Sequence, residues 1–396
     1  MSRLDELIAE FCPDGVKYFR LKDVCKEIIV PMRDRPKDLK GPIPWCRIED
    51  KEGQYFNGSL SGLGVTEETV KKMNLKVFPT GTVICSCSAS IGAYAINTQP
   101  LITNQTFIGL VSGEKLYNMF LLFFMETQTA FLLSQASTGT IPYISRKKFE
   151  EMLIPVPPLP VQLEIVRILN HFRELIVELA AELTAELTAR KKQYEYYRDK
   201  LLTSLDNSAP VYSMGDVLTF INGRAFKQQE LLDDGKYPVL RVGNFYTNNS
   251  WYYSDLELSE DKYCDNGDLL YSWAATLGPK IWNGGKCIFH YHIWKIIFDE
   301  TLIDKVYLYY YLQYDLSEIA KSTTQSTMVH VSMESMKKRK ISIPPIDDQR
   351  RLAALIKEFD SLQSSVSNGI PAEIDARQKQ YEYYRDKLLT FKEISL

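Results

Sequence analysis

The sequence predicts an α+β protein in which two mixed α/β domains are each followed by a long helix, and three observations support this. A nearly identical segment occurs twice, an apolar seam of helical spacing leads into each copy, and strand-like and helix-like segments alternate before them. With 396 residues, the chain is too long for one ordinary domain. Hydrophobic residues make up 45% and aromatic residues 12%, which is ample for packed cores and excludes a disordered chain.

The internal repeat is clearest at its end. The segment ARKKQYEYYRDKLLT, from Ala189, returns as ARQKQYEYYRDKLLT from Ala376, with one difference in fifteen positions and an offset of 187. The same offset aligns IPVPPLPVQ, from Ile154, with ISIPPIDDQ. GTVICSCSASIG, from Gly81, resembles GDLLYSWAATLG, from Gly267. A repeat this long is not a solenoid unit. It predicts two copies of a variable globular part followed by a nearly invariant tail.

Each tail has the pattern of a long helix. Pro160 suits the first helical position, and Asp347 and Asp348 favour the positive end of the helix dipole at the matching start. Apolar side chains then recur at alternating steps of three and four, as in a coiled coil. Gly369 and Pro371 interrupt the second pattern and predict a kink or short break rather than a turn back. The predicted seam consists of Ile165, Leu169, Phe172, Ile176, Leu179, Tyr194, Tyr197, Leu201, Leu352, Ile356, Phe359, Tyr381, Tyr384 and Leu388.

The parts before the tails have the pattern of mixed α/β domains. Val83–Ser88, Leu269–Trp273 and Cys287–Trp294 resemble strands, whereas Lys115–Gln135 and Lys305–Lys321 have the apolar periodicity of helices. The predicted organisation is a first domain at 1–158, a first helix at 159–206, a second domain at 207–345 and a second helix at 346–396.

The charge of the chain argues against a protein that binds nucleic acid by bulk charge. The formal net charge is −3, so any DNA binding must come from local patches. Basic residues do cluster at Arg33–Lys40, Arg146–Lys148 and Lys337–Lys340. A solvated face is the simpler interpretation of each run taken alone.

The cysteines and the first residues indicate a cytoplasmic protein. Seven cysteines, an odd number scattered over a long chain, suggest reduced thiols rather than a disulfide framework. The start, MSRLDELIAEFC, has acidic residues inside its first apolar stretch, unlike a signal peptide. No apolar run approaches the roughly 20 residues of a membrane-spanning helix.

No catalytic signature is complete in this sequence. Gly62–Gly64 begins a dinucleotide-type pattern, but Glu67 stands where the third glycine belongs. Gly284–Lys286 lacks the upstream glycine of a phosphate loop. The two Pro-Pro pairs are not preceded by Asn, as an amino-methyltransferase loop requires. We therefore predict no catalytic residues.

The sharpest alternative is a metal site formed by Cys264, Cys287, His290 and His292. A Cys-x-x-His-x-His sequence without a second cysteine pair is a weak zinc signal. His290, His292 and Trp294 would also share one face of a period-two strand. We therefore predict no metal site and leave open a structural role or a DNA-facing role for these side chains.

The whole pattern resembles the specificity subunits of Type I restriction–modification systems. The order is a variable domain, PPxxxQ, a long helix with RxKQYEYYRDKLL, and then the same three parts again. The resemblance covers essentially all 396 residues, and GPIPW at Gly41 and YPVLR at Tyr237 also fit. Gly369 and Pro371 depart from the uninterrupted second helix that is commoner in the family.

The resemblance implies a sequence-specific DNA-binding subunit. Each variable domain would be a target-recognition domain that reads one half of a bipartite, asymmetric site in double-stranded DNA. The two helices would pair as an antiparallel coiled coil, set the spacing of the half-sites, and give a pseudo-two-fold molecule. Two copies related in this way suit DNA whose half-sites recur about one turn apart.

The resemblance also implies a non-catalytic subunit. Methyltransferase subunits, usually two, would dock along the helix seam and carry adenine methylation, and motor-nuclease subunits would complete the restriction complex. S-adenosylmethionine, ATP and Mg²⁺ would belong to those partners, with no cofactor in this chain. The rival interpretations are a fragment of a fused restriction–methylation enzyme, which needs a catalytic centre, and a coiled-coil scaffold without DNA function.

Basic and amide side chains of the two variable domains are the candidates for DNA contact, because Arg and Lys suit guanine or phosphate and Asn and Gln suit adenine. In the first domain they are Arg33, Arg35, Lys37, Arg47, Asn104, Gln105, Thr140 and Arg146. In the second domain they are Arg224, Lys227, Arg241, Trp273, Lys280, His292 and Lys295.

The first helix contains a tandem AELTAELT, Ala181–Thr188. Four extra residues form a stutter that a coiled coil absorbs by local unwinding, and they lengthen a helix by about 6 Å. The segment is either simply good helix-forming sequence or the element that sets the gap between half-sites.

Overall fold

The computed structural model describes residues 2–137, 142–204, 209–246, 248–322 and 330–394. By their contacts, the residues form two compact units, Met1–Glu182 with Ala372–Leu396, and Leu183–Pro371. The divisions fall inside both long helices, so each half of a helix belongs to the unit against which it packs. Each unit contains a mixed α/β domain and parts of two long helices, which confirms the predicted fold class.

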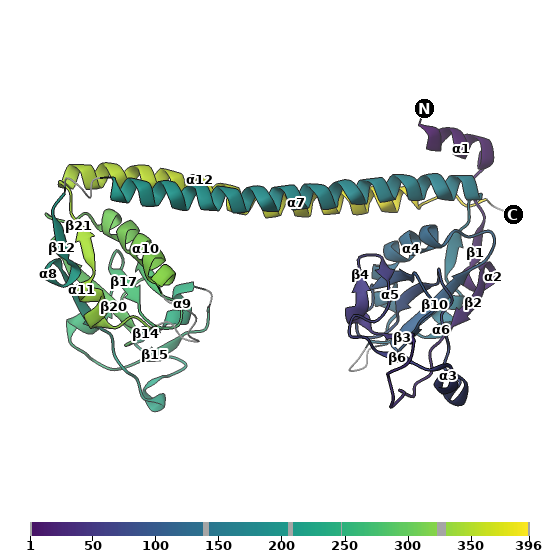
Figure 1. Ribbon diagram of the computed structural model, residues 1–396, viewed down its shortest axis with the longest axis horizontal. Helices are drawn as coiled ribbons and strands as arrows, with labels where there is room; N and C mark the ends of the chain where they lie inside the picture. Colours follow the sequence, from purple (N-terminus) through teal and green to yellow (C-terminus); the bar gives the residue numbers. More distant parts are fainter. Residues whose placement is uncertain (1, 138–141, 205–208, 247, 323–329, 395–396) are drawn as a thin grey trace. The chain divides into compact units, whose positions relative to one another are not determined.

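The first unit is built on a six-stranded sheet, β2-β10-β7-β8-β5-β4, with a three-stranded sheet, β6-β3-β9, and a two-stranded sheet, β1-β11 (Figure 1). Helix α4 packs on β7 and β8 and lies between the sheet and α7 (Figure 1). The elements are α1 (Arg3–Phe11), β1 (Tyr18–Arg20), α2 (Leu21–Val24), β2 (Cys25–Ile29), β3 (Ile43–Cys46), β4 (Lys51–Glu52), β5 (Tyr55–Phe56), β6 (Gly64–Val65), α3 (Glu67–Met73), β7 (Val83–Ser86), β8 (Tyr94–Asn97), β9 (Ile102–Thr103), β10 (Phe107–Ser112), α4 (Asn118–Thr127), α5 (Thr129–Gln135), α6 (Arg146–Glu150), β11 (Leu153–Pro155) and α7 (Leu159–Thr203).

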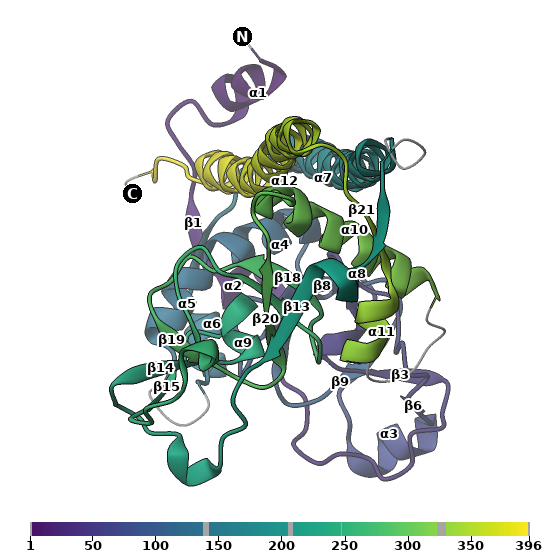
Figure 2. The same cartoon turned by 90° about the vertical axis from the view of Figure 1, so that its left-hand side faces the viewer.

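The second unit is built on two four-stranded sheets, β13-β20-β17-β18 and β15-β14-β19-β16, and a two-stranded sheet, β12-β21. Helix α10 lies between the first of these sheets and α12 (Figures 1 and 2). The elements are β12 (Val211–Ser213), α8 (Met214–Val217), β13 (Leu218–Asn222), β14 (Tyr237–Leu240), α9 (Val242–Tyr246), β15 (Tyr252–Ser254), β16 (Tyr263–Cys264), β17 (Leu269–Ser272), β18 (Gly278–Ile281), β19 (Cys287–Phe289), β20 (Ile293–Phe298), α10 (Lys305–Ser322), α11 (Met333–Lys338), β21 (Lys340–Ser342) and α12 (Ile346–Leu388).

The two units repeat one topology. The strand order β2-β10-β7-β8 corresponds to β13-β20-β17-β18, and the pair β1-β11 corresponds to β12-β21. The smaller sheets also match, since β3 runs parallel to β9 and antiparallel to β6, just as β14 runs parallel to β19 and antiparallel to β15. The internal repeat of the sequence is therefore a repeat of the fold.

A buried glutamine joins each α/β domain to the helix that follows it. Gln162 of α7 is fully buried, accepts the N–H of Tyr117, and donates to the carbonyls of Lys115 and Pro157. Gln349 of α12 makes the same three bonds 187 positions later, to the N–H of Asp304 and the carbonyls of Leu302 and Pro344. The Gln of each PPxxxQ motif therefore fixes the start of the long helix on its domain.

Both long helices form, with details that the sequence did not predict. Helix α7 has 45 residues and starts at Leu159, so Pro160 lies in its first turn but is not its first residue. Helix α12 has 43 residues and continues as one helix through Gly369 and Pro371, so it does not turn back, as predicted, but the short break is absent. The space around Gly369 is open, since an added Cβ would meet nothing within 4 Å.

Two other predicted elements are each divided in the structure. The segment Cys287–Trp294 is not one strand, because a turn closed by the N–H of Ile293 and the carbonyl of His290 separates β19 from β20. The two strands belong to different sheets, so His290, His292 and Trp294 do not share a strand face. The predicted helix Lys115–Gln135 is divided into α4 and α5 at Gln128.

The seven cysteines are free thiols, and all except Cys25 are buried. Cys85 and Cys87 lie in the same hydrophobic core. None of the described helices has the length and apolar character needed to cross a membrane.

Candidate nucleic-acid interface and helix-pair surface

Three loops meet at one surface of the first unit. Cys87, which begins the β7–β8 loop, donates its N–H to the carbonyl of Thr106 and accepts the N–H of Ile144, each over 2.8 Å. The turn between β9 and β10 places Asn104 and Gln105, two of the predicted DNA contacts, beside this loop. We call this the three-loop surface of the first unit; it comprises residues 87–93, 104–106 and 142–144.

The second unit has the same three-loop surface. Trp273, which begins the β17–β18 loop, donates its N–H to the carbonyl of His292 over 3.1 Å and accepts the N–H of Val331 over 3.2 Å. These bonds match those of Cys87, so the surface comprises residues 273–277, 290–292 and 330–331. Trp273 and His292, which the sequence singled out, therefore lie together on this surface, at the positions equivalent to Cys87 and Thr106.

Aromatic and imidazole rings form the surface in the second unit. The Trp273 ring centroid lies 5.0 Å from His292, 6.2 Å from Tyr291 and 6.1 Å from His330. Below them, the buried Trp294 stacks on Trp273 at 6.0 Å and fixes its orientation. The indole N–H of Trp273 donates to the Tyr291 carbonyl, so its ring rather than its N–H is available to a ligand. Rings of this kind suit contact with nucleic-acid bases.

Three of the four histidines in the chain lie on this surface. Burial, with the nearby His292 and Arg241, lowers the pKa of His290 from 6.5 to about 4. Burial, with the nearby His330, also lowers the pKa of His292. The imidazoles of His290 and His292 are therefore neutral near pH 7, and each is able both to donate and to accept a hydrogen bond.

This shift predicts a loss of stability of the second unit in acid. As the pH falls from about 7 to about 4, the unfolded chain binds a proton on His290 that the folded chain does not bind, so the free energy of unfolding falls. The urea midpoint of the second unit measures this fall. His290→Gln is expected to flatten the dependence in this range, and an equally steep dependence in that variant would contradict the assignment.

Both three-loop surfaces contain an alanine in the left-handed region. Ala89 has φ of 59° and Ala275 has φ of 63°, at equivalent positions of the β7–β8 and β17–β18 loops. An alanine in this region costs about 1 kcal/mol or more, and such strain persists where the surroundings impose it, often at functional sites. The repetition of this strained position in both units is independent support for a functional role of the loops.

The basic candidates of the first unit lie in different places. Arg33, Arg35 and Lys37 are exposed in the connection between β2 and β3. Arg47 pairs with Glu49 at 3.3 Å, and Arg146 of α6 pairs with Glu150 at 2.6 Å. Asn104 accepts the N–H and the hydroxyl of Thr106 and so shapes the turn in which it lies, whereas Gln105 is exposed. Thr140 falls outside the described residues.

The basic candidates of the second unit also divide into two groups. Arg241 and Lys227 are exposed, and Arg224 pairs with Glu230 at 3.1 Å. Lys280 and Lys295 are used inside the domain: Lys280 donates to the carbonyl of Phe245, and Lys295 pairs with Asp268 at 2.7 Å. Sequence reasoning missed Tyr291 and His330, although a concentration of histidines in one domain was a signal for this surface. Among the described residues, no three His, Cys, Asp or Glu side chains lie close enough to hold a metal ion.

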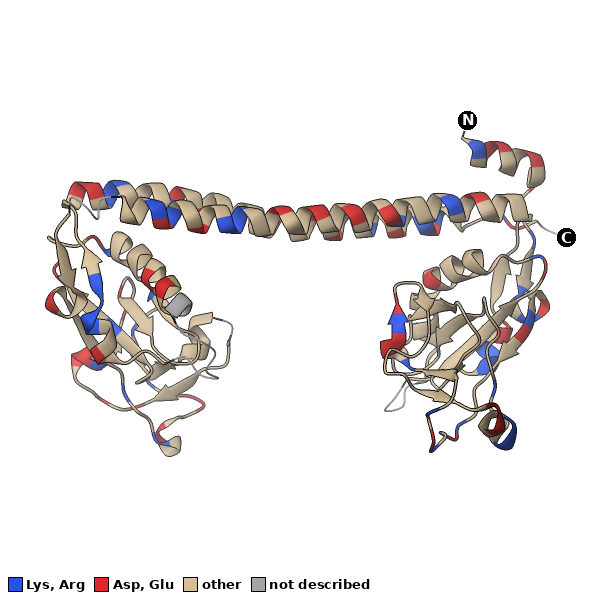
Figure 3. Ribbon diagram, in the orientation of Figure 1, with Lys and Arg blue, Asp and Glu red and all other residues tan. Residues whose placement is uncertain are grey.

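Within each unit, one long helix packs beside part of the other, and both carry interspersed acidic and basic residues (Figure 3). In the first unit, Phe172 of α7 stacks on Tyr384 of α12 with centroids 6.5 Å apart. In the second unit, the equivalent residues Phe359 and Tyr197 line one groove. These four rings are 43–44% exposed, so each unit presents the same aromatic pair to its surroundings.

The predicted seam residues fall into three groups by burial. Ile165 and Leu169 are buried in the core of the first domain, as Leu352 and Ile356 are in that of the second. Tyr381 is also buried. The partly buried group is Ile176, Leu179, Tyr194, Leu201 and Leu388. The exposed group is the four rings of the aromatic pairs.

Comparison with known proteins identifies the family. Residues 13–189 and 209–376 each match the type I restriction modification DNA specificity domain. A Haemophilus influenzae protein named as a type I restriction enzyme specificity subunit is 36% identical over 297 residues, which cover 72% of this chain and 75% of that protein. An Escherichia coli type I restriction enzyme specificity subunit is 30% identical over 268 residues, covering 63% of this chain and 65% of that subunit.

A solved structure has the same fold. A chain solved to explain complex assembly and conformational transition of the type I restriction–modification system superposes with a TM-score of 0.70 at 17% identity. The match covers 95% of this chain and 98% of that chain. This chain belongs to the family of type I restriction–modification DNA specificity subunits. Its function is to give such a system its DNA sequence specificity, which is a non-catalytic role.

Proposed function

We propose that the chain reads a bipartite DNA site, one half through the three-loop surface of each unit. The observation that carries this proposal is the repetition of one surface with different side chains. Asn104 and Gln105 of the first unit stand where His290 and Tyr291 stand in the second. Because base edges are read by side-chain hydrogen bonds and apolar contacts, two such surfaces read different bases.

Within this proposal, the contacts divide by chemistry. Exposed Arg33, Arg35, Lys37, Lys227 and Arg241 contact phosphates and position the domains on DNA. The base-reading side chains are Gln105 and Tyr143 in the first unit and Trp273, Tyr291, His292 and His330 in the second. Lys280 and Lys295 have structural roles instead, since their ammonium groups bind within the domain.

The proposal extends to the partners. The aromatic pairs Phe172–Tyr384 and Phe359–Tyr197 are equivalent and exposed, so they suit two copies of one partner. We assign them to two methyltransferase subunits, which bind S-adenosylmethionine and methylate adenine. Motor-nuclease subunits with ATP and Mg²⁺ complete the restriction complex. The purified chain alone therefore neither methylates nor cleaves DNA.

Co-expression with the methyltransferase subunit of the same system tests this proposal. The wild-type complex is expected to contain two methyltransferase copies by native mass spectrometry and to methylate adenine. Phe172→Glu and Phe359→Glu are each expected to remove one copy, because a buried unpaired carboxylate is costly. His171→Glu and Lys357→Glu are exposed neighbours and serve as matched controls. Methylation by the isolated chain, or two copies retained in both Phe variants, would contradict it.

A further inference from the structure

The end of the domain helix that faces the long helices differs between the two units. The offset of 187, which aligns Gln162 with Gln349 and their three bonds, also aligns α4 with α10. At this offset, Glu126 of α4 is equivalent to Gln313 of α10. The same offset aligns Arg173 of α7 with Asp360 of α12.

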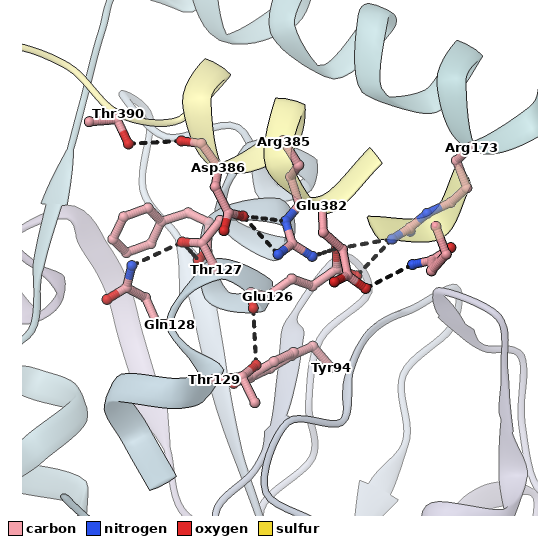
Figure 4. Close-up of polar contacts among 12 residues, drawn as sticks. Tyr94, Glu126, Thr127, Gln128, Thr129, Arg173, Glu382, Arg385, Asp386 and Thr390 are labelled. Atoms are coloured by element: carbon pink, nitrogen blue, oxygen red, sulfur yellow. Dashed lines mark hydrogen bonds and ion pairs between the residues drawn. The ribbon is translucent and has the colours of Figure 1, made fainter. Parts of the chain in front are cut away.

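In the first unit, Glu126 and two arginines form a junction between the domain and both long helices (Figure 4). Arg173 of α7 donates to both oxygens of the Glu126 carboxylate at 3.0 Å, and Arg385 of α12 lies 3.7 Å from it. The Arg173 guanidinium also lies over the rings of Phe123 and Tyr381. Glu126 is at the negative end of α4, where these cations offset an unfavourable dipole.

In the second unit, the charge at position 360 is opposite to that at the equivalent position 173, whereas Arg198 of α7, equivalent to Arg385, is again a cation and is buried. The Asp360 carboxylate lies near the phenols of Tyr310, on α10, and Tyr194, on α7. Burial, together with this negative charge, raises the pKa of both tyrosines. Gln313, which replaces the glutamate, donates to the hydroxyl of Tyr309 and carries no charge. An acid on the long helix is therefore tolerated because the domain helix offers hydroxyls instead of a carboxylate.

The two junctions differ in charge at positions 173 and 360. The first domain on the second junction would place Glu126 against Asp360, two like charges in a partly buried contact. The second domain on the first junction would leave Arg173 opposite Gln313 and Tyr310, without its carboxylate partner. Selection against a wrong partner by unpaired or like charges is a general source of specificity.

We propose that positions 173 and 360 are positioning residues that match each recognition domain to its own junction with the long helices. Arg173 orients the first domain through Glu126, and Asp360 orients the second through Tyr310. The inference rests on the proposed function, since the orientation of a domain matters for reading its half-site. It adds that the two domains do not exchange positions unless these residues are exchanged with them.

Three variants of the full chain, assembled with the methyltransferase subunits, test the local claim. DNA affinity is measured on duplexes that retain only the first or only the second half-site. Arg173→Asp is expected to weaken binding to the first half-site by about tenfold or more and to leave the second unchanged. The reason is that the new carboxylate at position 173 would face the carboxylate of Glu126. The triple variant Phe123→Tyr, Glu126→Gln, Arg173→Asp rebuilds the second junction and is expected to recover to within about threefold. Lys191→Asp, at an exposed position of α7, is the control.

These results separate the inference from a structural effect. Equal weakening on both half-sites, or a triple variant no better than Arg173→Asp, would overturn it. If the wild-type complex itself bound neither half-site, the proposed function would fail instead.

A domain exchange tests the matching directly. Pro210–Ser342 replaces Lys17–Pro155, with ends at equivalent positions, since Lys17 and Pro210 accept the N–H groups of Val156 and Ile343. The exchanged chain with Arg173→Asp is expected to bind a site made of two second half-sites about tenfold more tightly than the exchanged chain with Arg173. Equal binding by the two would overturn the matching.

Discussion

Replacing Met214–Ile341 with the second recognition domain of another specificity subunit is expected to change one half of the methylated site completely and to leave the other half intact. The replaced segment begins directly after β12 and ends within β21, two strands that pair antiparallel with Ser213 opposite Lys340 and Tyr212 opposite Ile341. Its core, which includes Tyr271, Trp294 and Leu312, is separate from the core of the first domain. Sequencing of methylated adenines in cells that express the hybrid measures the result.

The donor domain for this exchange should carry residues that suit Asp360 of α12. A donor domain with an uncharged residue at the position of Gln313 and a tyrosine at that of Tyr310 suits Asp360, whereas a carboxylate at the first position does not. A hybrid that recognises two new half-sites would show that the two units do not read DNA independently. A hybrid of unchanged specificity would show that the recognition residues lie outside the exchanged segment.

Shortening the long helices is the second large effect that we expect. Deleting Ala185–Thr188 removes one AELT from α7, about 6 Å of helix at about 1.5 Å per residue. Since base pairs stack at about 3.4 Å, the preferred unspecified spacer is expected to shorten by one or two base pairs while both half-sites stay the same. Methylation sequencing against sites with graded spacers measures the shift.

The structure suggests a matched variant for this deletion. Glu186 and Arg190 of α7 line one groove with Val366 and Gln363 of α12, so a deletion in α7 alone leaves unmatched residues in the neighbouring helix. Deleting Asn368–Pro371 as well shortens both helices and also removes the proline. The paired deletion is expected to restore activity at the shorter spacer, and activity at the original spacer would contradict a spacing role for the helices.

The sequence predicted the repeat, the long helices and the mixed α/β domains because each is a periodic or duplicated pattern. It did not predict where local geometry overrides the pattern. The β-branched Thr127 and Thr129 flank the interruption at Gln128, and both hydroxyls bond to carbonyls one turn back. The α12 helix continues through Pro371, at an exposed position where water is able to bind the carbonyl of Ser367 in place of the missing N–H.

Only part of the candidate site could be predicted from the sequence. Asn104, Gln105, Trp273 and His292 were chosen for their chemistry. The surface of each unit on which they lie depends on a backbone bond, to residue 144 in the first unit and to residue 331 in the second, that no spacing reveals. The Lys295–Asp268 pair joins residues 27 positions apart and could not be predicted, whereas Arg146–Glu150 has the i,i+4 spacing of a helical ion pair. The Glu126–Arg173 pair joins residues 47 positions apart and has no sequence signature.

We propose that this chain alone sets the DNA sequence that its system methylates. Genome-wide mapping of methylated adenines in the source organism, with and without the gene for this chain, tests it most directly. We predict one bipartite motif, with two unlike halves around a fixed spacer, that loses methylation when the gene is removed and regains it when the gene returns. A methylation pattern that stays the same after removal of the gene would contradict the account.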